Sequence, residues 1–417
     1  METARWGEEE REDSMAVNIG RRNVRERLAT FGFFIFMGTG TSAWFSRLPS
    51  VKEILGLQPS SLALMTILGG CGALVGMVVS GVLTNRLGVR RAMLLGASTW
   101  CLGMLVASFA IWRLSLPGVV LGLLFNSAGI SLWGTVNTVE AGAVERNAEH
   151  SVMARFHASY SLGMFLALGL GSLISHLGIP VEVHLAVNAL VTLGLMACCL
   201  LICPADPQGD DTGSVGDSGA ECAGDDRSPM RKQMAAWGDS LVLMLALINV
   251  ALEASEGAVN DWSSIGLVDS FRAPESMANL APTVFAAAMI VSRMLGPWVI
   301  ERLGNTVSLY LTLLVSALGI LVYSLSPVLA VSLVGTGIWG IGAALGVPIV
   351  TTLATRDPSM AAQRASVIST AYYGVSWIIP PAIGFLADHT GVRPALLPLA
   401  LVLVLVTLLV RPVSRKG

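Results

Sequence analysis

The sequence is short of charged residues, histidine and cysteine. Charged residues make up 13% of the 417 residues, about half of the quarter that soluble domains carry. The five histidines and six cysteines are too few and too scattered for a metal-rich or disulfide-stapled protein, and no spacing indicates a metal site. The net charge of -2 provides no basic field for nucleic acid. These shortages exclude a cytosolic enzyme, a DNA-binding protein and a disordered chain.

Apolar residues are what the chain has in excess, at 53% of the sequence with a mean hydropathy of +0.69. A membrane helix needs about 20 mostly apolar residues, and windows of that length give twelve candidate spans. The spans are residues 28–49, 61–83, 92–112, 117–139, 156–178, 183–203, 238–262, 279–300, 306–325, 327–350, 366–388 and 394–411. Because these runs are continuous, the sequence predicts an all-α membrane protein with 12 transmembrane helices.

The Lys and Arg residues of the loops predict the orientation, because cytoplasmic loops carry an excess of them. With the N-terminus inside, twenty basic residues fall on the cytoplasmic side and five outside, and Arg293 falls within a span. We therefore expect a multi-pass protein of the cell (inner) membrane with both termini in the cytoplasm.

A polar stretch over residues 204–236 separates two sets of six spans. It is rich in Gly, Ser and Asp and has no apolar period, so it buries too little apolar area to offset the entropy of ordering. We expect a disordered acidic cytoplasmic linker here. The remaining parts are a cytoplasmic leader over 1–26, an N-terminal six-helix half over 27–203, a C-terminal six-helix half over 237–411 and a tail over 412–417.

The two halves carry matching segments. Span two ends in Asn85-Arg86-Leu87-Gly88, and span eight ends 216 residues later in Glu301-Arg302-Leu303-Gly304. Spans five and eleven close in a similar way, before Gly178 and Gly391. Two pairs at nearly equal offsets indicate an internal repeat, and parallel six-span repeats around a central site are one plan on which transporters are built.

The loop after span two carries a motif of glycines and arginines. It reads Gly81-Val-Leu-Thr-Asn85-Arg86-Leu-Gly88-Val-Arg90-Arg91, which resembles the loop motif of the major facilitator superfamily. Asn85 stands where an Asp is usual, and in the family that acid helps to latch the cytoplasmic helix ends. The resemblance implies a cytoplasmic gate at this motif, with the Glu301-Arg302 copy as the other place where a latch could lie.

A narrower resemblance is to a poorly characterised bacterial branch that is distantly related to sugar permeases such as the fucose permease. Its marks are Trp44-Phe-Ser-Arg47-Leu-Pro49, His157-Ala-Ser-Tyr-Ser161-Leu-Gly163, Glu256-Gly257 and Asp261-Trp262-Ser263. Two patterns of proton-coupled drug antiporters, an Arg embedded in span four and a Gly-Pro pattern in span five, are absent. Their absence makes drug efflux a less favoured function for this sequence but does not exclude it.

Span seven places acids at membrane depth. Its apolar run before Glu253 is only the twelve residues from Leu241 to Leu252, too short to cross, so Glu253 and Glu256 are expected at membrane depth. An ionisable group there costs about 2.5–3.5 kcal/mol on insertion scales and is a functional candidate by default. Asn249, Glu253, Glu256 and Asn260 share one helical face. We interpret Glu253 and Glu256 as proton-coupling candidates and Asn260 as a cavity candidate. The alternative is a wet outer vestibule without a coupling role.

Span four supplies two further candidates, Asn137 for the substrate cavity and Glu140 for proton coupling. Interhelical hydrogen bonding is an equally good interpretation of Asn137, and a salt bridge is the better one for Glu140. Of the other charged residues, Arg47 is expected to reach the outer surface and Arg293 to join an ion pair near the cytoplasmic gate. Asp261 is expected to contact a gate or loop.

Spans one, four, seven and ten line the central cavity in the superfamily, and here each of them carries a tryptophan: Trp44, Trp133, Trp262 and Trp339. An indole stacks on sugar rings or apolar ligands and donates through its N–H, but Trp is also typical of membrane interfaces. We favour the interface for Trp262 and the cavity for Trp339, with Trp44 and Trp133 as further cavity candidates. Tyr372 in span eleven is a weaker one.

No pattern in the sequence indicates an enzyme or a cofactor, and no Walker loop is present for ATP. The sequence therefore predicts a secondary transporter that moves a small polar solute, with a sugar-like one as the leading candidate, by alternating access and proton-coupled symport. Drug or metabolite efflux by proton antiport is the alternative within transport. A non-transporting membrane sensor or scaffold is the alternative of another class. We expect the solute, a proton and membrane lipid as partners, no nucleic acid, and a monomer.

Overall fold

The computed structural model describes residues 2–146, 153–202, 237–356 and 360–416, and in these ranges every regular element is a helix. The whole predicted linker, residues 204–236, lies outside the described residues. Long apolar runs with few interior prolines favour helices, since a backbone in lipid must satisfy its hydrogen bonds within its own segment. The predicted all-α fold is confirmed.

The N-terminal group of helices covers spans one to six. Its elements are α1 (Glu2–Phe45), α2 (Leu48–Ile54), α3 (Pro59–Gly70), α4 (Gly72–Leu87), α5 (Val89–Trp112), α6 (Leu116–Arg146), α7 (Met153–His176) and α8 (Val181–Ile202). Span one is the second half of α1, which continues back through the predicted leader. Span two is divided at Cys71 into α3 and α4.

The C-terminal group covers spans seven to twelve. Its elements are α10 (Ser240–Ala258), the π-helical turn η1 (Val259–Ser263), α11 (Ser264–Phe271), α12 (Glu275–Ala278), α13 (Leu280–Leu325), α14 (Leu329–Ala343), α15 (Gly346–Ala354), α16 (Ala361–Ser376), α17 (Ile379–Thr390), α18 (Val392–Ala395), α19 (Leu397–Val406), the 3-10 turn η2 (Thr407–Leu409) and α20 (Val410–Lys416). Span seven is therefore built from α10, η1 and α11, and span ten from α14 and α15.

Within the described ranges, ten helical segments are long and apolar enough to cross a membrane. One of them holds two predicted spans, because α13 runs over spans eight and nine with a break at Gly304. Span eleven is divided between α16 and α17, which have 16 and 12 residues. Since these helices account for all twelve predicted spans, the twelve-helix architecture is confirmed.

The internal repeat is visible in the backbone. Gly88 has φ 77° and ψ 161°, and Gly304 has φ 75° and ψ 163°. Gly178 and Gly391, the second predicted pair, also have positive φ, at 69° and 87°. Residues other than glycine rarely adopt this backbone conformation. The matched glycines therefore turn the chain in the same way at corresponding places of the two halves.

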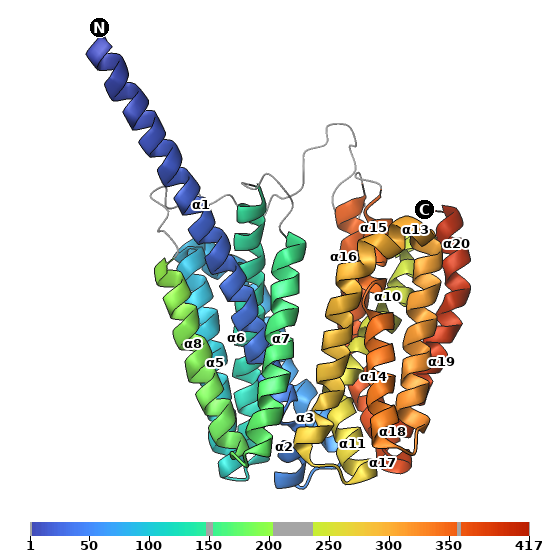
Figure 1. Cartoon of the computed structure of the whole chain (residues 1–417). Helices are drawn as coiled ribbons and strands as arrows, with labels where there is room; N and C mark the ends of the chain where they lie inside the picture. The colour runs from blue at the N-terminus through green and yellow to red at the C-terminus, as the bar shows by residue number, and fades with distance from the viewer. Residues whose placement is uncertain (1, 147–152, 203–236, 357–359, 417) are drawn as a thin grey trace.

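The two groups of helices stand side by side, with the beginning of α1 and the end of α20 at the same end of the bundle (Figure 1). The groups diverge towards this end, which we call the terminal end. They come together at the opposite end, where α3 packs on α17, α7 on α12 and α13, and α2 on α11. We call this second end the sealed end.

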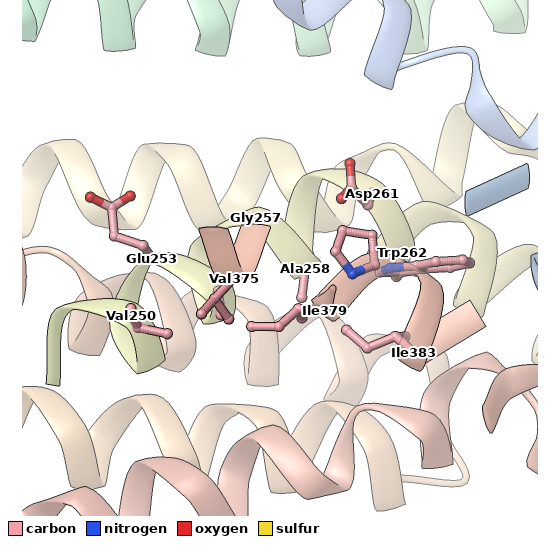
Figure 2. A pocket seen from close by; sticks show the side chains of 11 residues that line it. Val250, Glu253, Gly257, Ala258, Asp261, Trp262, Val375, Ile379 and Ile383 are labelled. Atoms are coloured by element: carbon pink, nitrogen blue, oxygen red, sulfur yellow. The ribbon is translucent and has the colours of Figure 1, made fainter. Parts of the chain in front are cut away.

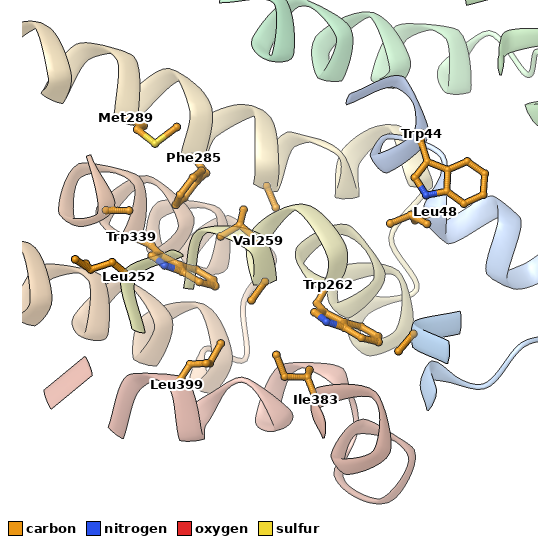
Figure 3. Packing of buried hydrophobic residues seen from close by; sticks show 14 of the residues in the cluster. Trp44, Leu48, Leu252, Val259, Trp262, Phe285, Met289, Trp339, Ile383 and Leu399 are labelled. Carbon is orange, nitrogen blue, oxygen red and sulfur yellow. The ribbon is translucent and has the colours of Figure 1, made fainter. Parts of the chain in front are cut away.

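Within each half, large aromatic side chains pack against glycines. The fully buried Trp339 forms edge-to-face contacts with Phe285 in the core of the C-terminal half (Figure 3). A Cβ on Gly319 of α13 would lie only 2.3 Å from the backbone nitrogen of Trp339. Because lipid supplies no hydrophobic force between helices, close backbone approach at small residues carries much of the packing energy.

We expect Gly319→Ala to lower the thermal unfolding midpoint of the purified protein, since the new methyl group meets backbone atoms that have little room to move. Overpacking of this kind costs about 1–3 kcal/mol. Gly194→Ala in α8 is the matched control, because its Cβ meets no atom within 4 Å and alanine is the better helix former. Equal midpoints for the two variants would contradict the packing argument.

Candidate functional site

Span seven is longer than its sequence predicted. The helix begins after Asp239, whose carboxylate accepts a hydrogen bond of 2.9 Å from the backbone N–H of Leu241. It continues through η1 and α11 to Phe271, although the prediction ended the span at 262. The reason is that the apolar face resumes beyond the two serines with the buried Ile265 and Leu267.

A small cavity of about 100 Å³ lies along this helix, between α10 with η1 on one side and α16 with α17 on the other. It is lined by Val250, Glu253, Ala254, Gly257, Ala258, Asp261, Trp262, Val375, Ile379, Pro380 and Ile383. Figure 2 shows the carboxylates of Glu253 and Asp261 pointing in the same direction, away from Ile379 and Ile383. A Cβ on Gly257 between them would meet no atom within 4 Å.

Glu256 forms an ion pair with Arg293 of α13, with 3.8 Å between Nη2 and Oε2. Arg293 also donates from Nε to the Ala344 carbonyl at 3.2 Å and from Nη1 to the Ser161 hydroxyl of α7 at 3.3 Å. The guanidinium therefore links an acid of span seven to the opposite half. We predicted an ion pair for Arg293 near the cytoplasmic gate; the pair exists, but its partner is the acid of span seven.

The polar face of span seven is only partly assembled as predicted. Asn249 is buried at 4% exposure, whereas Glu253, Glu256 and Asn260 are half-buried. The Asn260 side chain turns back to its own helix, and its Nδ2 donates to the Glu256 carbonyl at 3.4 Å. Asp261 and not Asn260 lines the cavity. A π turn at this position is a common feature of functional sites in helices.

The predicted roles of the tryptophans are reversed. Trp44, Trp133 and Trp339 are buried at 6%, 0% and 0% exposure, and the indole N–H of Trp339 donates to Ser255 at 2.7 Å. The predictions that place them at a cavity surface are not confirmed, because in this structure all three rings lie in the buried core and none lines the cavity beside span seven. Trp262, which we assigned to the interface, lines the cavity instead, because span seven extends beyond it.

The candidates of spans four and eleven do not join this cavity. Asn137 is fully buried, and in the described part of the chain neither atom of its amide has a hydrogen-bond partner. Glu140 is half-buried in the last third of α6, and its role stays a prediction. Tyr372 belongs to α16, but its side chain lies outside the described residues.

Arg47 and Glu275 hold the sealed end together from opposite halves. Their side chains are 5% and 11% exposed, with 3.4 Å between Nε and Oε2. Glu275 also accepts from the Ser50 backbone N–H at 3.0 Å and from the Ser175 hydroxyl at 2.7 Å. The expectation that Arg47 reaches the outer surface is therefore wrong, because a carboxylate of the other half meets it inside the protein.

Further contacts across the halves surround this pair. Lys52 of α2 forms an ion pair of 2.7 Å with Asp269 of α11. Asp388 of α17 accepts a hydrogen bond of 3.1 Å from the Ser60 backbone N–H at the start of α3. No pattern in the sequence indicates these pairings, because each joins loops or helix ends from different halves.

The glycine and arginine motif lies between α4 and α5 and faces the terminal end. Asn85, Arg86 and Arg91 are exposed, and Arg90 donates to the Leu200 carbonyl of its own half. In the repeat, Glu301 is exposed, and the guanidinium of Arg302 lies 4.5 Å from the ring centre of Trp298. The latch implied for this motif remains a prediction, as do the roles of Gly81 and Gly88.

Comparison with known proteins agrees with this fold. The family model of the Major Facilitator Superfamily matches residues 29–379. The chain therefore belongs to this superfamily and is a multi-pass membrane transporter of the permease kind. An uncharacterised transporter of the superfamily from Yersinia pestis is 27% identical over 396 residues, which cover 94% of this chain and 97% of the relative.

Solved structures show the same fold at low sequence identity. A variant of the nucleoside transporter NupG matches with a TM-score of 0.74 and 12% identity, over 94% of this chain and 99% of NupG. A variant of the fucose:proton symporter FucP of E. coli matches with a TM-score of 0.59 and 14% identity, over 93% of this chain and 98% of FucP. The resemblance to the superfamily and to its sugar permeases is confirmed.

We expect Glu275→Gln to loosen the sealed end, because it leaves Arg47 buried without its counter-charge, at a cost of about 3 kcal/mol. The check is the distance distribution between spin labels at Ile54→Cys and Ser270→Cys, measured in a variant whose native cysteines are replaced. A population at longer distance should appear. Glu53→Gln, an exposed acid of α2, is the control, and identical distributions in both variants would contradict the role of the pair.

Proposed function

We propose that the chain is a secondary transporter that takes up a small polar solute together with a proton by alternating access. The observation that carries this proposal is the group formed by Glu253, Glu256 and Arg293 inside the bundle. Charged groups at membrane depth are costly and mark ion or substrate paths. Both acids are half-buried, so a proton and a solute can reach the same region of the bundle.

The arrangement of the halves supports alternating access. They are joined at the sealed end by the Arg47–Glu275 pair and diverge towards the terminal end (Figure 1). If both termini are cytoplasmic, as the distribution of Lys and Arg predicts, this is an inward-facing state in the inner membrane. The opposite state requires the contacts of the sealed end to break while the motif around Arg86 and its copy around Arg302 approach the other half.

Arg293 offers a physical route from protonation to movement. It holds Glu256 of its own half and the Ser161 hydroxyl of the other half with different nitrogens. A proton on Glu256 removes the charge that attracts the guanidinium, so the balance between its two partners changes. In this proposal the proton therefore alters a contact between the halves, and coupling requires no separate proton site elsewhere.

Support for a polar solute comes from family and site together. NupG is a nucleoside transporter and FucP a fucose:proton symporter, and both share only the fold with this chain. The cavity beside span seven is lined by the carboxylate residues Glu253 and Asp261 together with Trp262, and carboxylates recognise polar groups rather than hydrocarbon. Efflux of a drug or metabolite by proton antiport uses the same groups in the opposite direction.

The test is accumulation in proteoliposomes that contain the purified protein, from a defined mixture of small polar solutes measured by mass spectrometry. An inward-directed proton gradient should drive accumulation of one class of solute. Glu256→Gln should reduce this accumulation at least 10-fold, because it cannot bind or release a proton, while exchange of solute across the membrane continues. Glu53→Gln, an exposed acid of α2 outside the site and the gate motif, should behave as the wild type.

Two outcomes would overturn the proposal. Undiminished gradient-driven accumulation in Glu256→Gln would remove the coupling role of this acid. Solute leaving the vesicles against its gradient, and never entering, would assign the protein to efflux.

A further inference from the structure

Asp261 is the carboxylate of the cavity that the protein leaves without a positive partner. Around this cavity the described residues supply three carboxylates, from Glu253, Glu256 and Asp261, against one guanidinium, from Arg293. Arg293 pairs with Glu256 and also acts electrostatically on Glu253. Asp261 has neither an ion pair nor a hydrogen bond among the described residues, although it is partly withdrawn from solvent.

The second unpartnered group belongs to the next residue of the chain. Trp262 is 2% exposed, and its indole N–H has no acceptor in the part of the chain that the structure describes. Its ring lines the same cavity, next to Asp261 (Figure 2). A buried donor without an acceptor is unfavourable, so an oxygen atom of a ligand at this position would be favoured.

The two groups also face the boundary between the halves. A second, smaller void shares Asp261, Trp262 and Pro380 with the cavity and is closed on its other side by Leu48, Leu62, Ala63 and Thr66 of the N-terminal half. Figure 3 shows Leu48 and Trp44 approaching Trp262 from that half. A ligand held by Asp261 would therefore lie where both halves can contact it.

We infer that the transported solute carries a protonated amine that binds Asp261, together with a hydroxyl or carbonyl oxygen that accepts from Trp262. This inference rests on the proposed transport function and narrows its substrate class to small polar amines. The amine does not bridge to Glu253, because eight residues of helix separate the two acids by about 12 Å. Glu253 and Glu256 thus remain available to the proton while the solute is bound.

The test compares solutes that share a scaffold and differ in charge. The purified full-length protein is heated with glucosamine, glucose or glucuronate, and with 1-amino-2-propanol, 1,2-propanediol or lactate. A ligand that binds the folded state raises the unfolding midpoint. Amines should raise the midpoint more than their neutral and anionic counterparts, and the apparent affinity for the amine should fall at least 10-fold in Asp261→Asn and several-fold in Trp262→Phe.

Glu53→Gln, an exposed acid of α2, is the control and should bind as the wild type. The inference is overturned if no amine stabilises the protein, if neutral or anionic members stabilise it equally, or if Asp261→Asn binds amines unchanged. The last result would show that the Asp261 carboxylate does not hold the amine. If the protein binds amines but transports nothing in proteoliposomes, the proposed transport function is wrong. If a proton gradient drives accumulation of neutral solutes alone, the transport function stands and the amine substrate class is wrong.

Discussion

The cost of an unpaired charge in a low-dielectric interior is the constraint on which the rest of this structure depends. Lipid does not solvate a guanidinium or a carboxylate, so each must find a partner, water or a ligand. Arg47 meets Glu275 across the halves, and Arg293 meets Glu256 within one half. The same constraint makes Asp261 informative, because no described cation serves it.

The ion pairs also divide the bundle into regions with different tasks. The buried Arg47–Glu275 pair and its hydrogen bonds lie at the sealed end, where breaking one partner leaves the other uncompensated. The Glu256–Arg293 pair is more exposed and longer, at 3.8 Å, so its strength responds more readily to a proton. The proposed alternating access requires such a combination, a firm contact between the halves at one end and a weaker ion pair farther in.

The repeat explains why so much of the fold follows from local sequence. Matched glycines at 88 and 304 take the same left-handed backbone conformation, and apolar runs of sufficient length form the spans between them. Departures from symmetry are concentrated in span seven, which contains a π turn and brings Glu253, Asp261 and Trp262 to the cavity. The candidate groups of the site therefore come from the C-terminal half, whereas Trp44 and Trp133 of the N-terminal half are buried in the core.

The sequence by itself determined the twelve helices, the two repeats and the presence of acids in span seven, because hydropathy, glycine positions and the cost of buried charge are local properties. The superfamily was indicated by the resemblance of the Gly81–Arg91 loop to the family's motif. It identified Glu253 and Glu256 as candidates and recognised that Arg293 needed a partner. Only the tertiary structure decided which partner that is, that Arg47 is buried, and that Trp262 rather than Trp339 lines the cavity. These outcomes depend on which helices face each other and how far each one extends, and the pattern within a single span carries no information about its neighbours.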